Sequence, residues 1–313
     1  MIPLSLITGF LGSGKTTLLQ AMVDRYQQHR LAYIVNEFGA VDVDGQRLQL
    51  SEQQLVRIPG GSIFCRCMAG EFIQGLQTIP NDCADSDGRL DGVIVEASGI
   101  ADPNVIVEML RETRLDRVYE LRTIVSVVDP GSFLKLIHTL PNIIAQVKAC
   151  QLAIVNKVDL YGEDEIERAE QEIARINPAA RTSRARYCQV DIDVFESVAC
   201  QDLKGDYAAC ADPNYVTEVA TVEKPIDVER MRAELCPIQS MVYRVKGFVP
   251  TTHGWLYVDM SSSGLMTRPA SDPGKPGSLV FIVRPEAQQR IKAFVTKLTR
   301  GEFAMASGRE SGM

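Results

Sequence analysis

Residues 9 to 16 carry the most specific chemical signal in the sequence. They fit G-x-x-x-x-G-K-[ST], the P-loop pattern, in which backbone N–H groups and the start of the next helix surround phosphate oxygens. In such a loop the Lys15 ammonium reaches the β- and γ-phosphates, and the Thr16 hydroxyl holds Mg²⁺. The residues expected to bind the nucleotide phosphates are Gly9, Gly12, Ser13, Gly14, Lys15, Thr16 and Thr17.

A second signal, N-K-x-D, stands far downstream at Asn156, Lys157 and Asp159. In a chain with a P-loop, this tetrapeptide indicates a guanine reader. The carboxylate accepts hydrogen bonds from the guanine N1–H and exocyclic amine, which adenine cannot supply. The pair of motifs therefore predicts GTP and GDP as ligands in preference to ATP.

Glu96 ends an apolar run, at the place where P-loop NTPases put an acid that positions Mg²⁺ or its water shell. A solvated acid at the end of a strand is the alternative. With Glu96 in the first role, we expect Lys15, Thr16 and Glu96 to serve the hydrolysis of GTP to GDP and phosphate.

The elements that must hold these residues alternate between apolar strands and helices. Uniformly apolar strands that alternate with helices are typical of a parallel sheet covered on both faces, which predicts an α/β P-loop NTPase fold. Polar residues at the carboxyl ends of such strands are where open α/β sheets bind ligands. The strands are expected at 3–8, 31–35, 55–58, 90–97, 122–128, 152–155 and 187–192, and the helices at 16–29, 69–78, 103–115, 143–150 and 163–176.

The periodicity fades after this region, which predicts a second and smaller unit. We expect a GTPase domain over 1–195, a linker region over 196–222, an α+β C-terminal domain over 223–303 and a mobile tail over 304–313. Within the C-terminal domain, antiparallel strands are expected at 241–246, 255–260 and 279–283, with helices at 227–235 and 287–298.

Composition narrows the class of protein. The chain has 313 residues, 45% of them hydrophobic, and a formal net charge of −7, which argues against a general nucleic-acid binder. No apolar run approaches the roughly 18 residues of a membrane span, and the first residues lack a basic leader. These features predict a cytoplasmic globular protein with no nucleic-acid or membrane partner.

Several motifs in this order resemble those of the CobW-type metallochaperone GTPases. Besides the P-loop and N-K-x-D, the resemblance rests on N-E-F-G at 36–39, Cys65-Arg66-Cys67, E-x-S-G-x-A-x-P at 96–103, Val128-Asp129, and R-V-K-G-F at 244–248. It spans nearly the whole chain. It implies a SIMIBI-class GTPase domain, a CobW-type C-terminal domain and a role as metallochaperone or metal-cofactor insertase.

The chain departs from the family at its metal-binding motif. Met68 stands where the family commonly has the last Cys of C-x-C-C, and the chain has only 3 His in place of a His-rich tract. A closed zinc site needs four N or S ligands, so Cys65 and Cys67 with Glu37 or Asp44 would form at most an open transfer site for Zn²⁺ or Co²⁺. A vestigial or redox-active C-x-C turn, and plain packing, stay open as alternatives.

The leading hypothesis is a slow GTPase switch that delivers a metal ion or metal cofactor to a client metalloprotein. Slow hydrolysis is expected because only Arg111, Arg114 and Arg117 are candidates, by position, for an arginine finger. The main alternative is a GTPase chaperone of a corrinoid or other metallocofactor protein that carries no metal itself. A P-loop small-molecule kinase, a non-hydrolysing regulatory module and a nucleotide-dependent homodimer are further hypotheses.

Overall fold

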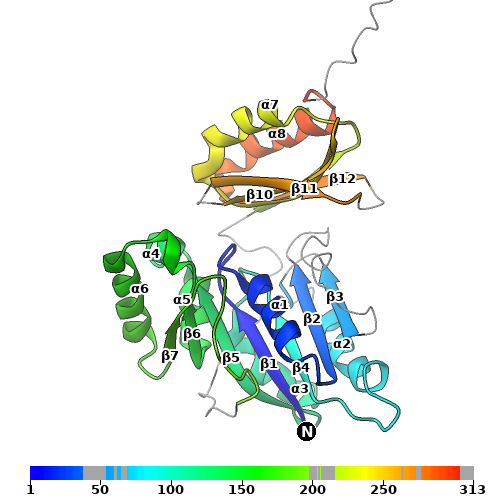
Figure 1. Cartoon of the computed structure of the whole chain (residues 1–313), viewed down its shortest axis with the longest axis vertical. Coiled ribbons are helices and arrows are strands. Elements are labelled where there is room, and N and C mark those ends of the chain that lie inside the picture. The colour runs from blue at the N-terminus through cyan, green and yellow to red at the C-terminus, as the bar shows by residue number, and fades with distance from the viewer. Residues whose placement is uncertain are drawn as a thin grey trace, which may run out of the picture. The chain divides into compact units, whose positions relative to one another are not determined.

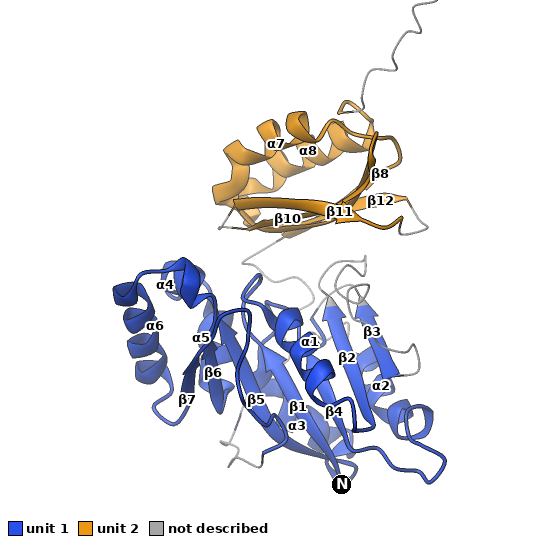
Figure 2. Ribbon diagram, in the orientation of Figure 1, with its two compact units in different colours: residues 1–38, 44–210 blue, residues 39–43, 211–313 orange. Residues whose placement is uncertain are grey.

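In the computed structural model the chain forms two compact units (Figure 2). The structure describes residues 1–37, 54–59, 62–64, 69–196, 203, 205, 216–261, 264–272 and 276–303. Of these, Met1 to Gly205 belong to the first unit and Val216 to Phe303 to the second. Among the described residues, no helix combines the length and the apolar character needed to cross a membrane.

The first unit is built on a seven-stranded sheet in the order β3-β2-β4-β1-β5-β6-β7. Every neighbouring pair in it is parallel. β1 lies at its centre, and Ile7 of β1 is in register with Glu96 of β4. The strands are β1 (Ile2–Thr8), β2 (Leu31–Glu37), β3 (Leu55–Pro59), β4 (Gly92–Glu96), β5 (Tyr119–Val128), β6 (Leu152–Val155) and β7 (Arg181–Arg184).

Helices cover both faces of this sheet (Figure 1). On one face, Ile7 and Ile94 pack in the same core cluster as Leu18 of α1. Their strand neighbours Leu6 and Val95 point to the other face and are also fully buried, which is why these strands are apolar throughout. The helices are α1 (Lys15–Arg25), α2 (Ala69–Asp82), α3 (Ile106–Glu112), α4 (Pro130–Leu136), α5 (Pro141–Ala149) and α6 (Glu163–Ile176).

The parallel arrangement fixes where the polar motifs lie. The segments that follow β1, β4, β5 and β6 leave the sheet at the same edge, since all these strands run in one direction. This edge therefore receives the P-loop, Glu96, Asp129 and the N-K-x-D residues, although more than a hundred residues separate the first from the last.

Two elements of this unit differ from the sequence-based expectation. The strand predicted at 187–192 is wrong: β7 lies at Arg181–Arg184, and Tyr187 and Cys188 adopt left-handed φ values of 52° and 54° that no strand tolerates. β7 is a polar edge strand with three exposed residues, so a search for apolar runs misses it. The helix α4 was not predicted. It is short and depends on the side chain of Asp129, which accepts a hydrogen bond from the Ser132 N–H at its first turn.

The second unit has a five-stranded antiparallel sheet in the order β11-β10-β9-β12-β8. Both α7 (Val228–Leu235) and α8 (Gln288–Thr299) pack against it, with Leu235, Phe281 and Ile291 in one core. This arrangement is visible in Figure 1, and with the first unit it confirms the predicted fold class. The strands are β8 (Val216–Val222), β9 (Val242–Thr251), β10 (Gly254–Ser261), β11 (Gly264–Ala270) and β12 (Gly277–Val283).

Two strands of this sheet were not expected. β8 lies inside the segment 196–222 that the sequence suggested as linker, and it pairs with β12, about sixty residues further along the chain. β11 is an edge strand whose residues are at best half-buried. β8 lies in a segment whose hydrophobic periodicity fades, and β11 is only partly buried, so neither strand stood out in the sequence.

A buried amide closes the end of α5 just before β6. Asn177 is only 3% exposed, and its Nδ2 donates to the carbonyl oxygens of Val147 (3.0 Å), Lys148 (3.2 Å) and Cys150 (2.8 Å). The last carbonyls of a helix have no partner within the helix, so a side-chain donor must supply one. Asn177 thus fixes the start of the strand that leads to N-K-x-D.

We expect Asn177→Ala to lower the free energy of unfolding of the first unit by about 2–4 kcal/mol, because buried carbonyls would lose their donor. Urea unfolding followed by circular dichroism measures this loss. Asn81→Ala is the matched control, since Asn81 is exposed on α2, and it should change the stability by less than about 0.5 kcal/mol. Equal stability of the two variants would contradict the assignment.

Candidate functional site

The P-loop follows β1 and passes straight into α1, which begins at Lys15. Its glycines are required by close contacts. A Cβ on Gly9 would lie 2.2 Å from the carbonyl oxygen of Val127, and one on Gly14 would lie 2.5 Å from Asn156 Nδ2. Both residues have positive φ, 132° and 118°, which glycine adopts at low cost. The loop therefore keeps its shape by packing its backbone directly against β5 and Asn156.

Three buried hydroxyl groups in or beside the loop have no hydrogen-bond partner among the described residues. Ser13 and Ser98 are 1% and 3% exposed, and among the described residues neither hydroxyl has a hydrogen-bond partner; Thr8, at the end of β1, is in the same state. Lys15 is 8% exposed, and its Nζ lies 3.4 Å from the Phe10 carbonyl oxygen, so the ammonium folds back over the loop. A buried hydroxyl without a partner is costly, which fits a site completed by a polar ligand.

Thr16 and Glu96 meet at the start of α1. The Thr16 hydroxyl donates to Glu96 Oε1 at 2.9 Å, joining residues that are far apart in the sequence. Glu96 is 3% exposed and ends β4, beside the end of β1. Oxygen ligands of this kind suit a hard cation such as Mg²⁺. The structure thus brings together two residues that the sequence had selected separately.

Asn156 connects the P-loop to the turn that follows β7. Its Nδ2 donates to the Ser13 carbonyl oxygen at 2.9 Å, and its Oδ1 accepts from the Cys188 N–H at 2.8 Å. The side chain is 2% exposed, so both bonds are shielded from water. Burial also raises the pKa of the Cys188 thiol to about 12, so the thiol stays neutral beside the Gly14 carbonyl oxygen at 3.4 Å.

The other two N-K-x-D residues also have partners. The Lys157 Nζ lies 2.6 Å from Asp129 Oδ2, and Asp129 in turn accepts from the Tyr161 hydroxyl at 2.6 Å. The Asp159 carboxylate is 3.6 Å from Arg186 Nε, and its side chain is 23% exposed. The sequence analysis named Asp129 as part of a family motif but did not predict its contact with Lys157. The position of Asp129 at the end of β5 indicates a polar role, by the same rule that selected Glu96 at the end of β4.

On the opposite side of β1, the amide of Asn36 joins three segments. It accepts from the Ile63 N–H at 3.0 Å and the Ser98 N–H at 3.2 Å, and it donates to the Ile58 carbonyl oxygen at 3.0 Å. Asn36 is 3% exposed. It therefore holds the turn after Glu96 and the chain that leads toward Cys65 in one hydrogen-bonded group.

The candidate transition-metal ligands cannot be placed. Cys65, Cys67 and Asp44 lie outside the described residues, as does the side chain of Glu37, whose backbone ends β2. Within the described part of the chain, no three His, Cys, Asp or Glu residues are grouped as a metal site would need.

Two of the three arginine-finger candidates, Arg114 and Arg117, are wrong for a site within one chain. Arg111 lies in α3, and Arg114 and Arg117 lie between α3 and β5, near Val118, whose carbonyl oxygen accepts from the N–H of Ile2. This is the amino end of β1, and a seven-residue strand places it about 20 Å from the P-loop.

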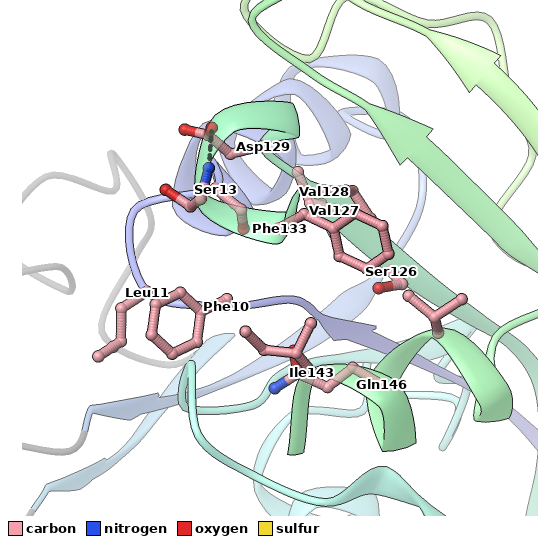
Figure 3. Close-up of a pocket in the computed structure, with 12 residues that line it drawn as sticks. Phe10, Leu11, Ser13, Ser126, Val127, Val128, Asp129, Phe133, Ile143 and Gln146 are labelled. Carbon is pink, nitrogen blue, oxygen red and sulfur yellow. Dashed lines mark hydrogen bonds between the residues drawn. The ribbon is translucent and has the colours of Figure 1, made fainter. Parts of the chain in front are cut away.

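A small pocket lies beside the P-loop (Figure 3). Phe10 and Ser13 of the loop face Val127, Phe133 of α4 and Ile143 of α5 across it. Its volume of about 10 Å³ is room for roughly one water molecule, so it is not a nucleotide cavity.

We expect Asn156→Asp to destabilise the nucleotide-free protein by about 2–4 kcal/mol. The new carboxylate would keep an acceptor for the Cys188 N–H but would set a buried charge against the Ser13 carbonyl oxygen. Urea unfolding without nucleotide measures the loss. Asn81→Asp on the exposed face of α2 makes the same chemical change as a control. Equal unfolding of the two variants would contradict the importance of this bond.

Comparison with known proteins places the chain in a family. Residues 3–184, more than half of the chain, match the family described as CobW/HypB/UreG, nucleotide-binding domain. The zinc chaperone YjiA of Escherichia coli is 24% identical over 311 residues, covering 93% of this chain and 97% of that protein. The zinc chaperone CobW of Pseudomonas aeruginosa is 29% identical over 210 residues, covering 57% of this chain and 55% of that protein.

Among solved structures, Zn(II)-bound YjiA GTPase from Escherichia coli is 20% identical, with 95% of this chain and 98% of that chain covered and a TM-score of 0.44. The sequence match, and not the superposition, therefore establishes the relationship. It covers the P-loop, the acidic strand end and the N-K-x-D motif, all of which lie between residues 3 and 184. The expected family is confirmed: the chain belongs to the CobW/HypB/UreG family of nucleotide-binding proteins.

Proposed function

We propose that this CobW/HypB/UreG GTPase is a slow switch whose nucleotide state controls the delivery of a metal to a client metalloprotein. The observation that carries the proposal is the 2.9 Å bond from Asn156 Nδ2 to the Ser13 carbonyl oxygen. It fastens the base-reading motif to the phosphate-binding loop through a single side chain. The names of the relatives, which are zinc chaperones, support the metal-delivery part.

The residues of the P-loop suit the binding of nucleotide phosphates. Gly9, Gly12 and Gly14 have positive φ and shape the loop, while the buried hydroxyl of Ser13 has no partner among the described residues and can donate to a phosphate oxygen. Lys15 would leave the Phe10 carbonyl oxygen for the β- and γ-phosphates, and Thr17 is exposed in the first turn of α1.

For Mg²⁺, the pair of Thr16 and Glu96 fits the ligand chemistry. The Thr16 hydroxyl would ligate the cation directly, and the Glu96 carboxylate would hold one of its waters. Their contact at 2.9 Å shows that both oxygens converge at the start of α1. Mg²⁺ supplies neutralisation of charge on the β- and γ-phosphate oxygens. Since Arg114 and Arg117 lie at the other end of β1, intrinsic hydrolysis should be on the order of 10⁻⁴ s⁻¹.

For the cargo, we propose Zn²⁺, held in transit by Cys65 and Cys67 with Glu37 as a third ligand. Two thiolates and a carboxylate leave the fourth position of a tetrahedral site open, which suits transfer better than storage. Co²⁺ would accept the same ligands. The Asn36 amide, which contacts both Ser98 and Ile63, connects the turn after Glu96 with the segment that precedes Cys65.

Asp159→Asn should change which base the protein binds. An amide cannot accept both guanine donors, so GTP affinity should fall about 10²- to 10⁴-fold, whereas xanthosine triphosphate, which has a carbonyl oxygen at C2, should gain affinity. Calorimetric titration with GTP, ATP and xanthosine triphosphate in the presence of Mg²⁺ measures this. Parental protein that binds ATP as tightly as GTP would refute the proposed function.

Replacing Cys65 and Cys67 by Ser together should abolish stoichiometric Zn²⁺ binding in the GTP-loaded protein, because serine hydroxyls are poor zinc ligands. Titration against a zinc-sensitive dye measures the stoichiometry. Cys236→Ser is the matched control, since Cys236 is exposed in the second unit. Unchanged stoichiometry in the double variant would reject the carrier role and favour the alternative, a chaperone of a corrinoid or other metallocofactor protein.

A further inference from the structure

Lys157 of the N-K-x-D motif is fastened by a buried carboxylate. Its Nζ lies 2.6 Å from Asp129 Oδ2, and the Asp129 side chain is 3% exposed. The second oxygen of Asp129 accepts from the Tyr161 hydroxyl at 2.6 Å and from the Ser132 N–H at 3.2 Å. Both oxygens of the carboxylate are therefore engaged, by the adjoining first turn of α4 and by two residues that flank the turn Val158–Leu160.

The backbone conformation at Lys157 links the position of its side chain to the position of Asp159. Lys157 has φ 62° and ψ 31°, a left-handed conformation that is unfavourable for a non-glycine residue. It opens the single 3₁₀ turn Val158–Leu160, on which Asp159 lies. The Val158 N–H is bonded to the Ala185 carbonyl oxygen at 3.2 Å. The turn that presents Asp159 is thus held from one side by its backbone and from the other by the Lys157 side chain.

The packing around Tyr161 also helps to hold the Asp129 carboxylate in place. A Cβ on Gly131 would lie 2.6 Å from the Tyr161 ring. Residue 131 must therefore be glycine for the Tyr161 hydroxyl to reach Asp129. Asp129 also caps that turn through the Ser132 N–H. The position of the carboxylate is consequently fixed by α4 and Tyr161 independently of Lys157.

We propose that Asp129, with Tyr161, is a positioning residue for guanine recognition. It does not touch the base. It holds the Lys157 side chain, and through it the turn that aims Asp159 at the guanine N1–H and exocyclic amine. The inference rests on the proposed GTP-binding function. It predicts that damage to Asp129 weakens discrimination between bases as well as affinity, because a misplaced Asp159 forms poor bonds to the donors that distinguish guanine.

The test compares GDP with inosine diphosphate, which lacks the exocyclic amine, in calorimetric titrations with Mg²⁺. The parental protein should prefer GDP by about tenfold or more. Asp129→Asn keeps the shape of the side chain and a cap for α4, but it turns an amide donor or a neutral oxygen toward the Lys157 ammonium. We expect its GDP affinity to fall about tenfold, its inosine diphosphate affinity to fall less, and the preference to drop below about threefold.

Two further variants keep the test decisive. Tyr161→Phe retains the carboxylate and the α4 cap, so it should fold and lose two- to fivefold of the GDP preference. Glu170→Gln removes a carboxylate from a surface pair with Arg184 in the same unit, and it should leave the preference unchanged.

An unchanged GDP preference in both Asp129→Asn and Tyr161→Phe, or an equal loss of both ligands, would overturn the inference. Each variant is melted first, and titrations are run well below its midpoint. If the parental protein binds ADP as well as GDP, the proposed function fails instead.

Discussion

The site depends on one buried amide. Asn156 donates to the Ser13 carbonyl oxygen and accepts from the Cys188 N–H, at a position that is 2% exposed. Through these bonds the loop after β1, the end of β6 and the turn after β7 form a single body. A side chain with one donor group and one acceptor group can do this, and neither Asp nor a hydrophobic residue of the same size can. The P-loop and the N-K-x-D motif are therefore joined by a buried hydrogen bond within the protein itself.

Around this amide the backbone is packed too closely for side chains. A Cβ on Gly9 would meet the Val127 carbonyl oxygen at 2.2 Å, and a Cβ on Gly99 would meet the Leu11 N at 2.6 Å. The P-loop thus rests directly on β5 on one side and on the turn after Glu96 on the other. Close backbone packing of this kind couples the position of the loop to the position of the Glu96 turn.

Asn36 extends this connection beyond the phosphates. Its amide contacts Ser98 after β4 and Ile63, a short way before Cys65. The Lys157–Asp129 pair belongs to the same edge of the sheet, beyond β5. The carboxyl edge therefore carries buried polar side chains from β2 across to β6. Each joins segments that are distant in the sequence, so that the described segments at this edge share one hydrogen-bonded framework.

The sequence by itself determined the P-loop, the N-K-x-D tetrapeptide, the acid at residue 96 and the parallel α/β fold, because glycine spacing and uninterrupted apolar runs are local properties. It did not reveal β7, β8 or β11, which are polar or half-exposed edge strands stabilised by pairing with distant partners. It also could not show that Lys157 meets Asp129, that Asn156 holds Ser13, or that the arginines between α3 and β5 lie at the wrong end of β1. Those facts depend on strand order and direction, and only the folded sheet brings the residues concerned together or keeps them apart.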